Sequence, residues 1–436
     1  MTDEFITERI RPSHASQRNP SIQHLSPWND IAGPIKTSSL KQDIKTDAVI
    51  VGAGIAGLSI ARTLAMEGKR CVVIDRGNIG NGETGRTSAH LSTSLDSRYF
   101  NLLETRGAET TRLIAQSHSS AINHIEKIVR RENIDCNFKR VNGYLFLHPS
   151  DRIKSLQKEF EATRWAGLCT ELISDTPGIR LKEAISLKFP WQAQFNPLKY
   201  LKGLCRTIER YGGRIYTNTQ AIKIDREGVT TDQYRINANH VVVATHVPFN
   251  EHLRTHIKQF RSRTYVVAAQ IPKGRLEPAL LWDTGENDSC WSVCPYHYVR
   301  VQSFSATHDL LICGGEDHSI SAKEIDGSEE SERLINLEAW TRHHFPMVED
   351  LAYRWSGEVM IPVDAIGYIG RNLGEQNVYI VSGGAGNGLT HGALAGTLIP
   401  DLIAKRKNPY EELYSLTRLP EQDEYSLHRA PVEQEV

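Results

Sequence analysis

The stretch Asp47-Ala-Val-Ile-Val51-Gly52-Ala-Gly54-Ile-Ala-Gly57 decides the fold of this chain. It begins with a short apolar run rich in β-branched side chains, which is typical of a strand buried on both faces. A helical pattern of apolar residues follows and ends at Gly68, and residues 71–75 form a second strand-like run. A strand, a glycine turn, a helix and a strand within about 30 residues predict a βαβ unit.

The glycines of this turn have the spacing Gly-x-Gly-x-x-Gly of a dinucleotide-binding loop. Gly52 permits the tight turn, Gly54 lets the backbone approach a pyrophosphate, and Gly57 allows close packing of helix on strand. Asp75, at the end of the second strand, would bind ribose hydroxyls, which argues against a 2′-phosphate but leaves both FAD and NAD open. A glycine turn in an ordinary βα unit is the alternative. The predicted contacts in this turn are Gly52, Ala53, Gly54, Ile55, Ala56 and Gly57.

Two later segments favour FAD. Residues 80–90 are mostly small or hydroxyl-bearing and include one Arg, which suits an extended phosphate and a ring. Residues 382–392 again join a buried strand to a helix, whose N-terminus would stabilise the negative charge that a flavin gains on reduction. We therefore predict that one FAD is held at both ends. Its further predicted contacts are Arg76, Thr84, Gly85, Arg86, Thr87, Ser88, Ala221, Ala244, Thr245, Gly386, Asn387, Gly388, Leu389 and Thr390.

Several segments together make the chain similar to a known family. They are residues 82–90, Pro295-Tyr-His-Tyr-Val-Arg300, Gly314-Gly-Glu-Asp-His318, Arg354-Trp-Ser-Gly357, Pro362-Val-Asp364 and Ile369-Gly-Arg-Asn372. Over about residues 46–410 the chain resembles the FAD-dependent oxidoreductases of the D-amino-acid oxidase, glycine oxidase and sarcosine oxidase superfamily. It looks most like the bacterial flavoproteins that often carry a C-terminal Rieske iron–sulfur domain. The resemblance implies FAD as cofactor and a small-molecule amine or amino-acid-like substrate.

The sequence departs from that family in two places. No Cys-x-His…Cys-x-x-His set follows the final predicted helix, so we expect no Rieske domain. The resemblance then implies that electrons pass to oxygen or to a separate electron-transfer protein. In the amino-acid oxidases a Gly-x-Arg-Pro segment supplies an arginine that clamps the substrate carboxylate. The matching residues 357–362 place Val359 at that position, which argues against a simple α-amino acid held by such a clamp.

Four residues are candidates for contact with the flavin or the substrate. The resemblance places His90 beside the flavin. Some members of the family attach FAD covalently through a nearby histidine, but we expect non-covalent FAD here. Tyr298 and Arg300 lie on one face of a predicted strand. On that face Arg300 would hold an acidic substrate group, and Tyr298 would form a wall with Tyr144; a surface ladder is the alternative. Trp355 would pack near the flavin or in the core.

The composition disfavours several classes of protein. The 51 Lys+Arg and 52 Asp+Glu residues nearly cancel, so we expect no nucleic-acid partner. The sequence contains no apolar run of about 18 residues and no signal-like segment, so we predict no membrane span and a cytoplasmic protein. The seven cysteines lack metal-ligand spacing, which predicts reduced thiols, with no metal site and no disulfide framework.

We predict an α/β fold in two domains. A Rossmann-like FAD-binding domain of the glutathione-reductase type would carry an inserted, mainly antiparallel β substrate domain. The FAD-binding domain would comprise residues 46–95, 196–252 and 353–415, and the substrate domain residues 96–195 and 253–352. Residues 1–45 would form an extended arm anchored by Trp28 and Leu40, with disorder as the alternative. Residues 416–436 would form a loose acidic tail.

The expected function is oxidation of a C–N bond in an amine or modified amino acid by hydride transfer to flavin N5. This chemistry needs a neutral amine and a largely water-free cavity, but no dedicated protein base. Three alternatives stay open: a tailoring enzyme that oxidises a C–OH or C–C bond, an electron-transfer flavoprotein for a separate iron–sulfur partner, and a nucleic-acid-modifying flavoprotein. The balanced charge disfavours the last of these.

Overall fold

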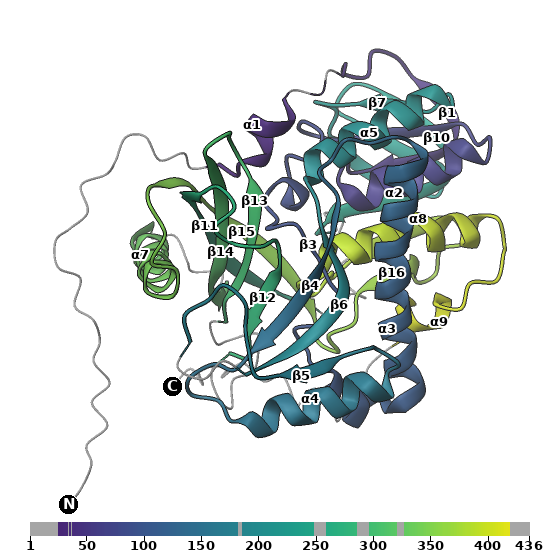
Figure 1. Cartoon of the computed structure of the whole chain (residues 1–436). Coiled ribbons are helices and arrows are strands. Elements are labelled where there is room, and N and C mark those ends of the chain that lie inside the picture. Colours follow the sequence, from purple (N-terminus) through teal and green to yellow (C-terminus); the bar gives the residue numbers. More distant parts are fainter. Residues whose placement is uncertain are drawn as a thin grey trace, which may run out of the picture.

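The first sheet of the computed structural model is built around the strands that the sequence predicts (Figure 1). The structure describes residues 25–33, 35, 37–181, 185–247, 259–285, 296–320 and 327–418. In this sheet β1, β2, β7, β10 and β17 pair in parallel, and β16 pairs with β17 in the opposite direction. The strand order is β16-β17-β10-β1-β2-β7, and β8 and β9 extend the sheet from β10. The bounds are β1 Ile44–Val51, β2 Cys71–Ile74, β7 Arg214–Tyr216, β8 Ala221–Asp225, β9 Gly228–Thr231, β10 Arg235–His246, β16 Tyr368–Arg371 and β17 Val378–Ser382.

Helices from distant parts of the chain pack together beside this sheet. The helix α2 (Ile55–Met66) contacts α5 (Pro197–Arg210) and α8 (Gly388–Ile403). The approach of α8 to α2 requires small residues, because a Cβ at Gly392 would lie 2.7 Å from the Ile55 side chain and one at Gly396 2.6 Å from Ser59. The long helix α3 (Tyr99–Arg131), which is kinked at Gly107, also contacts α8. The short helix α9 (Glu411–Tyr414) packs nearby.

The second sheet is mainly antiparallel, as predicted, with one parallel pair between β4 and β12. Its strand order is β15-β11-β14-β13-β12-β4-β6-β3, and β5 pairs with β6. The helix α7 (Gly327–His344) packs on β11 and β14, and α4 (Ile153–Trp165) contacts β5 and β6. The strand bounds are β3 His90–Leu91, β4 Lys139–Phe146, β5 Glu171–Ile173, β6 Ser186–Gln194, β11 Gln259–Pro272, β12 Leu280–Asp283, β13 Tyr298–Ser303, β14 His308–Ser319 and β15 Leu351–Pro362.

The division of the chain into two domains stays a prediction. Two segments expected in the FAD-binding domain, β3 and β15, are hydrogen-bonded in the second sheet. The short helix α1 (Trp28–Ala32) lies against α5. The expected anchors of the N-terminal arm, Trp28 and Leu40, are both buried. Residues 1–24 and 419–436, with most of the predicted tail, lie outside the described residues.

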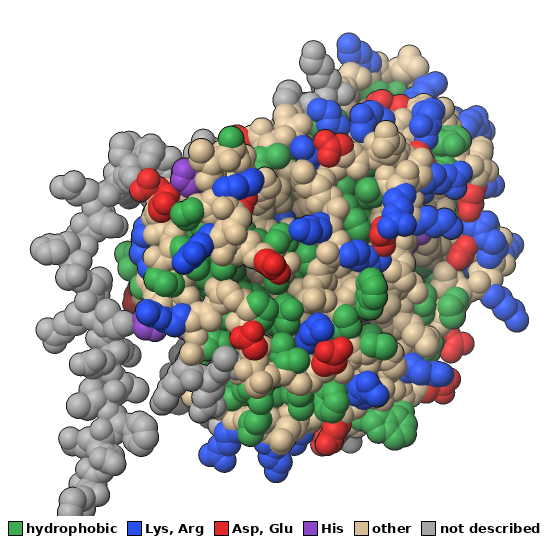
Figure 2. Space-filling model, viewed as in Figure 1, with side chains coloured by type: hydrophobic (Ala, Val, Ile, Leu, Met, Phe, Trp, Pro, Cys, Tyr) green, Lys and Arg blue, Asp and Glu red, His purple; other side chains and the backbone are tan. Residues whose placement is uncertain are grey.

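Acidic and basic side chains are interspersed on the face shown in Figure 2, in agreement with a formal net charge of −1. Among the described residues, no helix is both long and apolar enough to cross a membrane.

Candidate functional site

One cavity of about 840 Å³ is lined by residues from both sheets and by both glycine-rich loops. Gly52 and residues 54–56 border it, and so do residues 382–389, which lie more than three hundred positions later in the chain. The volume falls at the upper end of the range of ligand pockets, 300–1,000 Å³ or so, and suits a large cofactor. The first residues of α2 and of α8 both line the cavity, so two positive helix ends face the same space.

The first glycine loop has the geometry that its spacing predicts. Gly52 has a φ of 111°, and a Cβ there would lie 2.3 Å from the carbonyl oxygen of Ala244 in β10. A Cβ at Gly57 would lie 1.9 Å from the carbonyl oxygen of Gly52. Gly57 therefore lets α2 pack directly on its own entry turn, and this packing fixes where the amides of the loop point.

Two side chains brace this loop from the next segment of the chain. The carboxylate of Asp75 accepts hydrogen bonds from the backbone N–H groups of Ala53 (2.7 Å) and Gly77 (2.8 Å). The hydroxyl of Thr84, in the short 3₁₀ helix η1 (Glu83–Gly85), accepts one from the N–H of Ile55 at 3.1 Å. Both side chains also line the cavity. They lie within reach of a nucleotide that rests on this loop.

The second glycine loop turns sharply before α8. Gly383 and Gly386 have positive φ values of 72° and 79°, and Ala385 lies between them at 45°. A Cβ at Gly386 would lie 1.9 Å from a carboxylate oxygen of Asp96. The loop is thus shaped by close contact with the segment between β3 and α3. Its residues face the same cavity as the first loop, as one cofactor held at both ends requires.

His90 lies in the cavity wall as a neutral ring. Its Nδ1 is 2.9 Å from the Ser88 hydroxyl and its Nε2 is 3.3 Å from the carbonyl oxygen of Val299. Nε2–H therefore donates to Val299, and Nδ1 accepts from Ser88. Burial and the nearby Arg300 charge lower the pKa of His90 to about 3. Both ring nitrogens are thus engaged in hydrogen bonds within the wall.

Aromatic side chains form the wall of the cavity beside His90. The ring of Tyr298 lies edge-on to His90 with centroids 5.7 Å apart, and Trp282 lies at 5.8 Å. Tyr296 is 5.7 Å from Tyr298. The Tyr298 hydroxyl is 2.8 Å from Thr264 Oγ1, which fixes its orientation. These residues come from β11, β12 and β13 and the residues next to them, so the wall belongs to the second sheet.

Two carboxylates in this wall, the partly buried Asp96 and the buried Asp317, were not anticipated from the sequence. Asp96 accepts a hydrogen bond from the Tyr296 hydroxyl at 3.3 Å, and Asp317 accepts one from Thr264. Burial raises the pKa of Asp96 to about 6 and that of Asp317 to about 7, and the charge of Asp96 adds to the second shift. The motif at residues 314–318 includes Asp317, but nothing in it showed which of its residues faces inward.

Several residues predicted for the site do not line the cavity. Arg300 is 1% exposed and donates to the carbonyl oxygens of Ala89 (2.8 Å) and Phe195 (3.1 Å), so its guanidinium is used inside the fold. Trp355 is buried and donates to the carbonyl oxygen of Arg86. Tyr144 is buried in a cluster on the other side of the second sheet from Tyr298. The remaining predicted contacts that lie behind the cavity wall are Ala53, Gly57, Gly85 and Thr390.

The other predicted contacts border the cavity. His90 and Tyr298 do so on the second sheet. Val359, the residue at the expected position of the carboxylate-clamping arginine, also lines the cavity. Arg261 also lines the cavity, but its guanidinium is 2.7 Å from the Glu358 carboxylate. The predicted cofactor contacts at the cavity are Gly52, Gly54, Ile55, Ala56, Asp75, Arg76, Thr84, Arg86, Thr87, Ser88, Ala221, Ala244, Thr245, Gly386, Asn387, Gly388 and Leu389.

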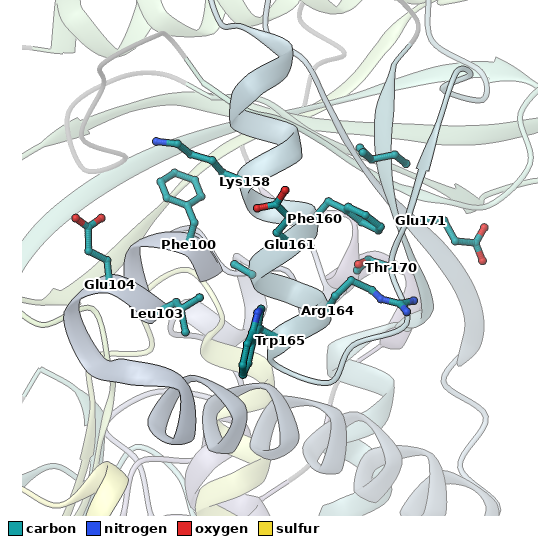
Figure 3. Close-up of a pocket in the computed structure, with 12 residues that line it drawn as sticks. Phe100, Leu103, Glu104, Lys158, Phe160, Glu161, Arg164, Trp165, Thr170 and Glu171 are labelled. Carbon is teal, nitrogen blue, oxygen red and sulfur yellow. The ribbon is translucent and has the colours of Figure 1, made fainter.

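A second hollow of about 1000 Å³ lies on the outside of the molecule between α3, α4 and β5 (Figure 3). Its lining includes Phe100, Leu103 and Trp165, and Trp165 is 70% exposed. It shares no lining residue with the cavity between the sheets. Residues of the two glycine loops are not among those that line it.

Comparison with known proteins identifies the class to which this fold and cavity belong. The model of the DAO family of FAD-dependent oxidoreductases matches residues 47–402. The chain belongs to this family, and it is an enzyme whose cofactor is FAD. The glycine loops, the cavity volume and the two helix N-termini described above fit that cofactor.

Individual relatives share most of the chain. A putative Rieske 2Fe-2S iron–sulfur protein of Bacillus subtilis, YhfW, is 28% identical over 87% of this chain and 73% of the relative. The γ-glutamylputrescine oxidoreductase of Escherichia coli is 26% identical over 88% of this chain and 89% of its own. Among solved structures, glycine oxidase from Geobacillus kaustophilus superposes with a TM-score of 0.71 at 18% identity, covering 86% of this chain and 100% of that one. This last likeness shows a shared fold.

Proposed function

We propose that this enzyme oxidises the C–N bond of an amine or amino-acid-like compound. The observation that carries the proposal is that one and the same cavity joins both glycine loops to the wall formed by His90, Tyr296 and Tyr298. Bound FAD supplies a two-electron acceptor there. The names of two relatives, γ-glutamylputrescine oxidoreductase and glycine oxidase, support a substrate that contains an amine.

In the proposed reaction the C–H bond next to nitrogen breaks, its hydride leaves with two electrons, and the nitrogen lone pair forms the C=N bond. Water then hydrolyses the imine, or the imine cyclises. The wall residues hold the substrate carbon close to the acceptor and exclude water from it. His90 cannot serve as a cation at neutral pH, since burial lowers its pKa to about 3. It instead acts as a fixed, neutral part of the wall.

The test is a spectrum of the purified protein before and after anaerobic addition of amines. We expect a yellow flavin spectrum that at least one amine in a panel bleaches, while dithionite bleaches it fully as a positive control. Flavin that dithionite reduces but no amine reduces would contradict C–N oxidation. Denaturing the protein should release free FAD into solution, because both nitrogens of His90 are engaged in hydrogen bonds.

A separate iron–sulfur protein is a second candidate for the electron acceptor, beside oxygen. Its support is the likeness to a protein named as a Rieske iron–sulfur protein, combined with the lack of a Rieske motif in these 436 residues. The acceptor is tested by reducing the enzyme anaerobically and then mixing it with oxygen. Reoxidation within one turnover time supports oxygen as acceptor, and reoxidation far slower than amine-dependent reduction supports a protein acceptor.

A further inference from the structure

We infer that the substrate is a di- or polyamine, and that Asp96 and Asp317 hold a cationic nitrogen other than the one that reacts. This inference deepens the proposed C–N oxidation and rests on it. The reacting nitrogen must be neutral to release a hydride from its carbon, whereas a second nitrogen keeps its ordinary charge. The wall of the cavity would therefore recognise a positive charge at a distance from the reacting bond.

Asp317 reaches the cavity through an irregularity in β14. The pairing of β11 with β14 shifts between Arg263 and Tyr265, and Glu316 has a φ of 57°. The extra residue reverses the alternation of side chains at this point. Asp317 consequently lines the cavity, although it is only 7% exposed. Glu316 instead lies 3.8 Å from the His297 ring nitrogen behind the strand.

Asp96 reaches the same wall from the segment between β3 and α3. It contacts Tyr296, and its carboxylate packs against Gly386 of the second glycine loop. The charges of Asp96 and Asp317 raise the pKa of Tyr296 together with burial. Both carboxylates thus act on one tyrosine ring, and both line one cavity.

Neither carboxylate forms an ion pair with a described Lys or Arg side chain. Arg98 lies close enough to lower the pKa of Asp96, but its guanidinium donates to the carbonyl oxygens of Leu95 and Asp283. The charge of His297 also lowers the pKa of Asp317, but that ring lies against Asp283 and Glu316. Two carboxylates that are removed from water and lack an ion pair of their own are costly to keep. Such an arrangement is expected where a ligand supplies the missing charge.

The aromatic part of the wall suits a cation, and Arg261, a basic residue that lines the cavity, is already paired with Glu358. Tyr296, Tyr298 and Trp282 present aromatic rings, which attract ammonium groups when water is excluded. The position of the expected carboxylate clamp is Val359, and Arg300 is withdrawn into the fold. An α-amino acid would bring a negative charge toward two carboxylates, whereas a diamine brings a positive one.

The test compares diamines with a matched monoamine on the holoenzyme. Butane-1,4-diamine and n-butylamine share the reacting end and differ in the second nitrogen. We expect kcat/KM for the diamine to exceed that for n-butylamine and for glycine by tenfold or more. In D317N and in D96N that preference should fall by about tenfold, mainly through a higher KM for the diamine. A tenfold change corresponds to about 1.4 kcal/mol. Equal rates for diamine and monoamine, or a preference for glycine, would overturn the inference while leaving C–N oxidation intact.

A second measurement does not depend on turnover. Hexane-1,6-bis(trimethylammonium) carries two fixed charges and no oxidisable amine, and its binding is followed by the shift of the flavin absorbance. We expect binding to the native enzyme and a tenfold or greater rise in Kd in D317N. The control is D309N, which lies on the same strand β14 but outside the cavity, beside Lys273. Binding that is unchanged in D317N, or weakened as much in D309N, would refute the cation site.

Discussion

Asp317 shows how the environment of a single side chain sets both its chemistry and its cost. Burial raises the pKa of this carboxyl to about 7, against a smaller opposing effect of the Thr264 hydrogen bond. The folded protein therefore binds the Asp317 proton more tightly than the unfolded chain does. A group of this kind stabilises the fold at low pH and loses that contribution as pH rises through its folded pKa.

We predict that Asp317→Asn stabilises the protein at pH 8. The gain over the native enzyme should be small near pH 4, grow as pH rises from 4 to 7 and stay constant above 7. Denaturant unfolding of both proteins at several pH values measures it. A stability difference that instead favours the native enzyme more at pH 8 than at pH 4 would show that the ionised Asp317 carboxylate is stabilised by a positive charge inside the fold.

We predict that Gly57→Ala lowers FAD retention. The added methyl group would lie 1.9 Å from the Gly52 carbonyl oxygen, so α2 or its entry turn must move, at a cost of roughly 1–3 kcal/mol. FAD released on gel filtration is the measurement. Gly68→Ala is the matched control, because a Cβ there has no heavy atom within 4 Å. It strains a positive φ but should leave FAD bound; equal FAD loss in both variants would contradict this account.

Most of the predicted cofactor contacts line the cavity, whereas of the predicted catalytic residues only His90 and Tyr298 do. The roles of Gly52 and Gly57 could be derived from spacing, because a βα turn is a local structure. The burial of Arg300 could not be derived, because its carbonyl partners at Ala89 and Phe195 lie far away in the chain. Alternation placed it on the face of Tyr298, but only the tertiary fold shows that this part of the face is covered.

The short helix α1 supports the cavity wall through its residue Trp28. Trp28 is fully buried, and its indole N–H donates to the carbonyl oxygen of Thr87 at 2.7 Å. The Arg300 guanidinium lies 5.4 Å from the centre of the Trp28 ring and binds the carbonyl of Ala89. The arm and β13 thereby brace residues 87–89 from behind, directly beside the cavity wall.

We predict that Trp28→Ala destabilises the protein by about 3–5 kcal/mol and weakens FAD retention, because it leaves a cavity behind the cofactor segment. Thermal unfolding and FAD release measure the two effects. Trp165→Ala is the control, because it removes a tryptophan from the exposed second hollow of Figure 3. It should change stability by about 0.5 kcal/mol or less. Similar losses in both variants would show that α1 does not brace the site.

The bulge in β14 explains why the strand pattern of the sequence did not show that Asp317 faces the cavity. A regular strand over residues 308–319 would place Asp317 and Gly315 on one face and Glu316 on the other throughout. The shifted pairing opposite Thr264 breaks that rule locally. Bulges depend on the partner strand, so the sequence of β14 alone could not reveal which acid faces the cavity.

Across the whole molecule, a buried ionic cluster joins the second sheet to α7. His297 Nδ1 lies 2.9 Å from Asp283 Oδ2, and its ring stacks on Trp340 with centroids 4.1 Å apart. Burial alone would lower the pKa of His297, but the carboxylates of Asp283 and Glu316 raise it to about 9. In the same contact burial acts to raise the pKa of Asp283, but the hydrogen bonds from His297 and the nearby histidine charges together lower it. His344 stacks on the far side of Trp340.

We predict that this cluster makes the native protein lose stability between pH 6.5 and about 9. The protonated His297 is favoured by the folded state, so its contribution is complete below pH 6.5 and disappears as pH rises through 9; it is on the order of 3 kcal/mol. The difference in unfolding free energy between the native protein and His297→Gln should shrink across that range. A difference that stays constant from pH 6 to 10 would show that His297 is neutral in the fold.

The sequence indicated the two-sheet architecture because strand-like and helical segments alternate in a recognisable order along the chain. The mainly antiparallel second sheet and the parallel core of the first were both predicted, and both are confirmed. The domain limits were harder to predict, because β3 and β15 cross from segments near the cofactor into the second sheet. The strands that pair with β3 and β15 are distant in the chain, so the local sequence pattern does not show which sheet each strand joins.

The close seating of α8 on α2 has a consequence for biogenesis. The hydroxyl of Thr63 donates to the carbonyl oxygen of Gly396 at 2.6 Å, so the two ends of the flavin cradle are locked by contact between the first and the last long helices of the described chain. A ribosome that has translated only through residue 380 has exposed the nucleotide loop but not its counterpart. Tight capture of the coenzyme must therefore await synthesis of residues 382–389, and a chain that stops before them should lose the coenzyme readily.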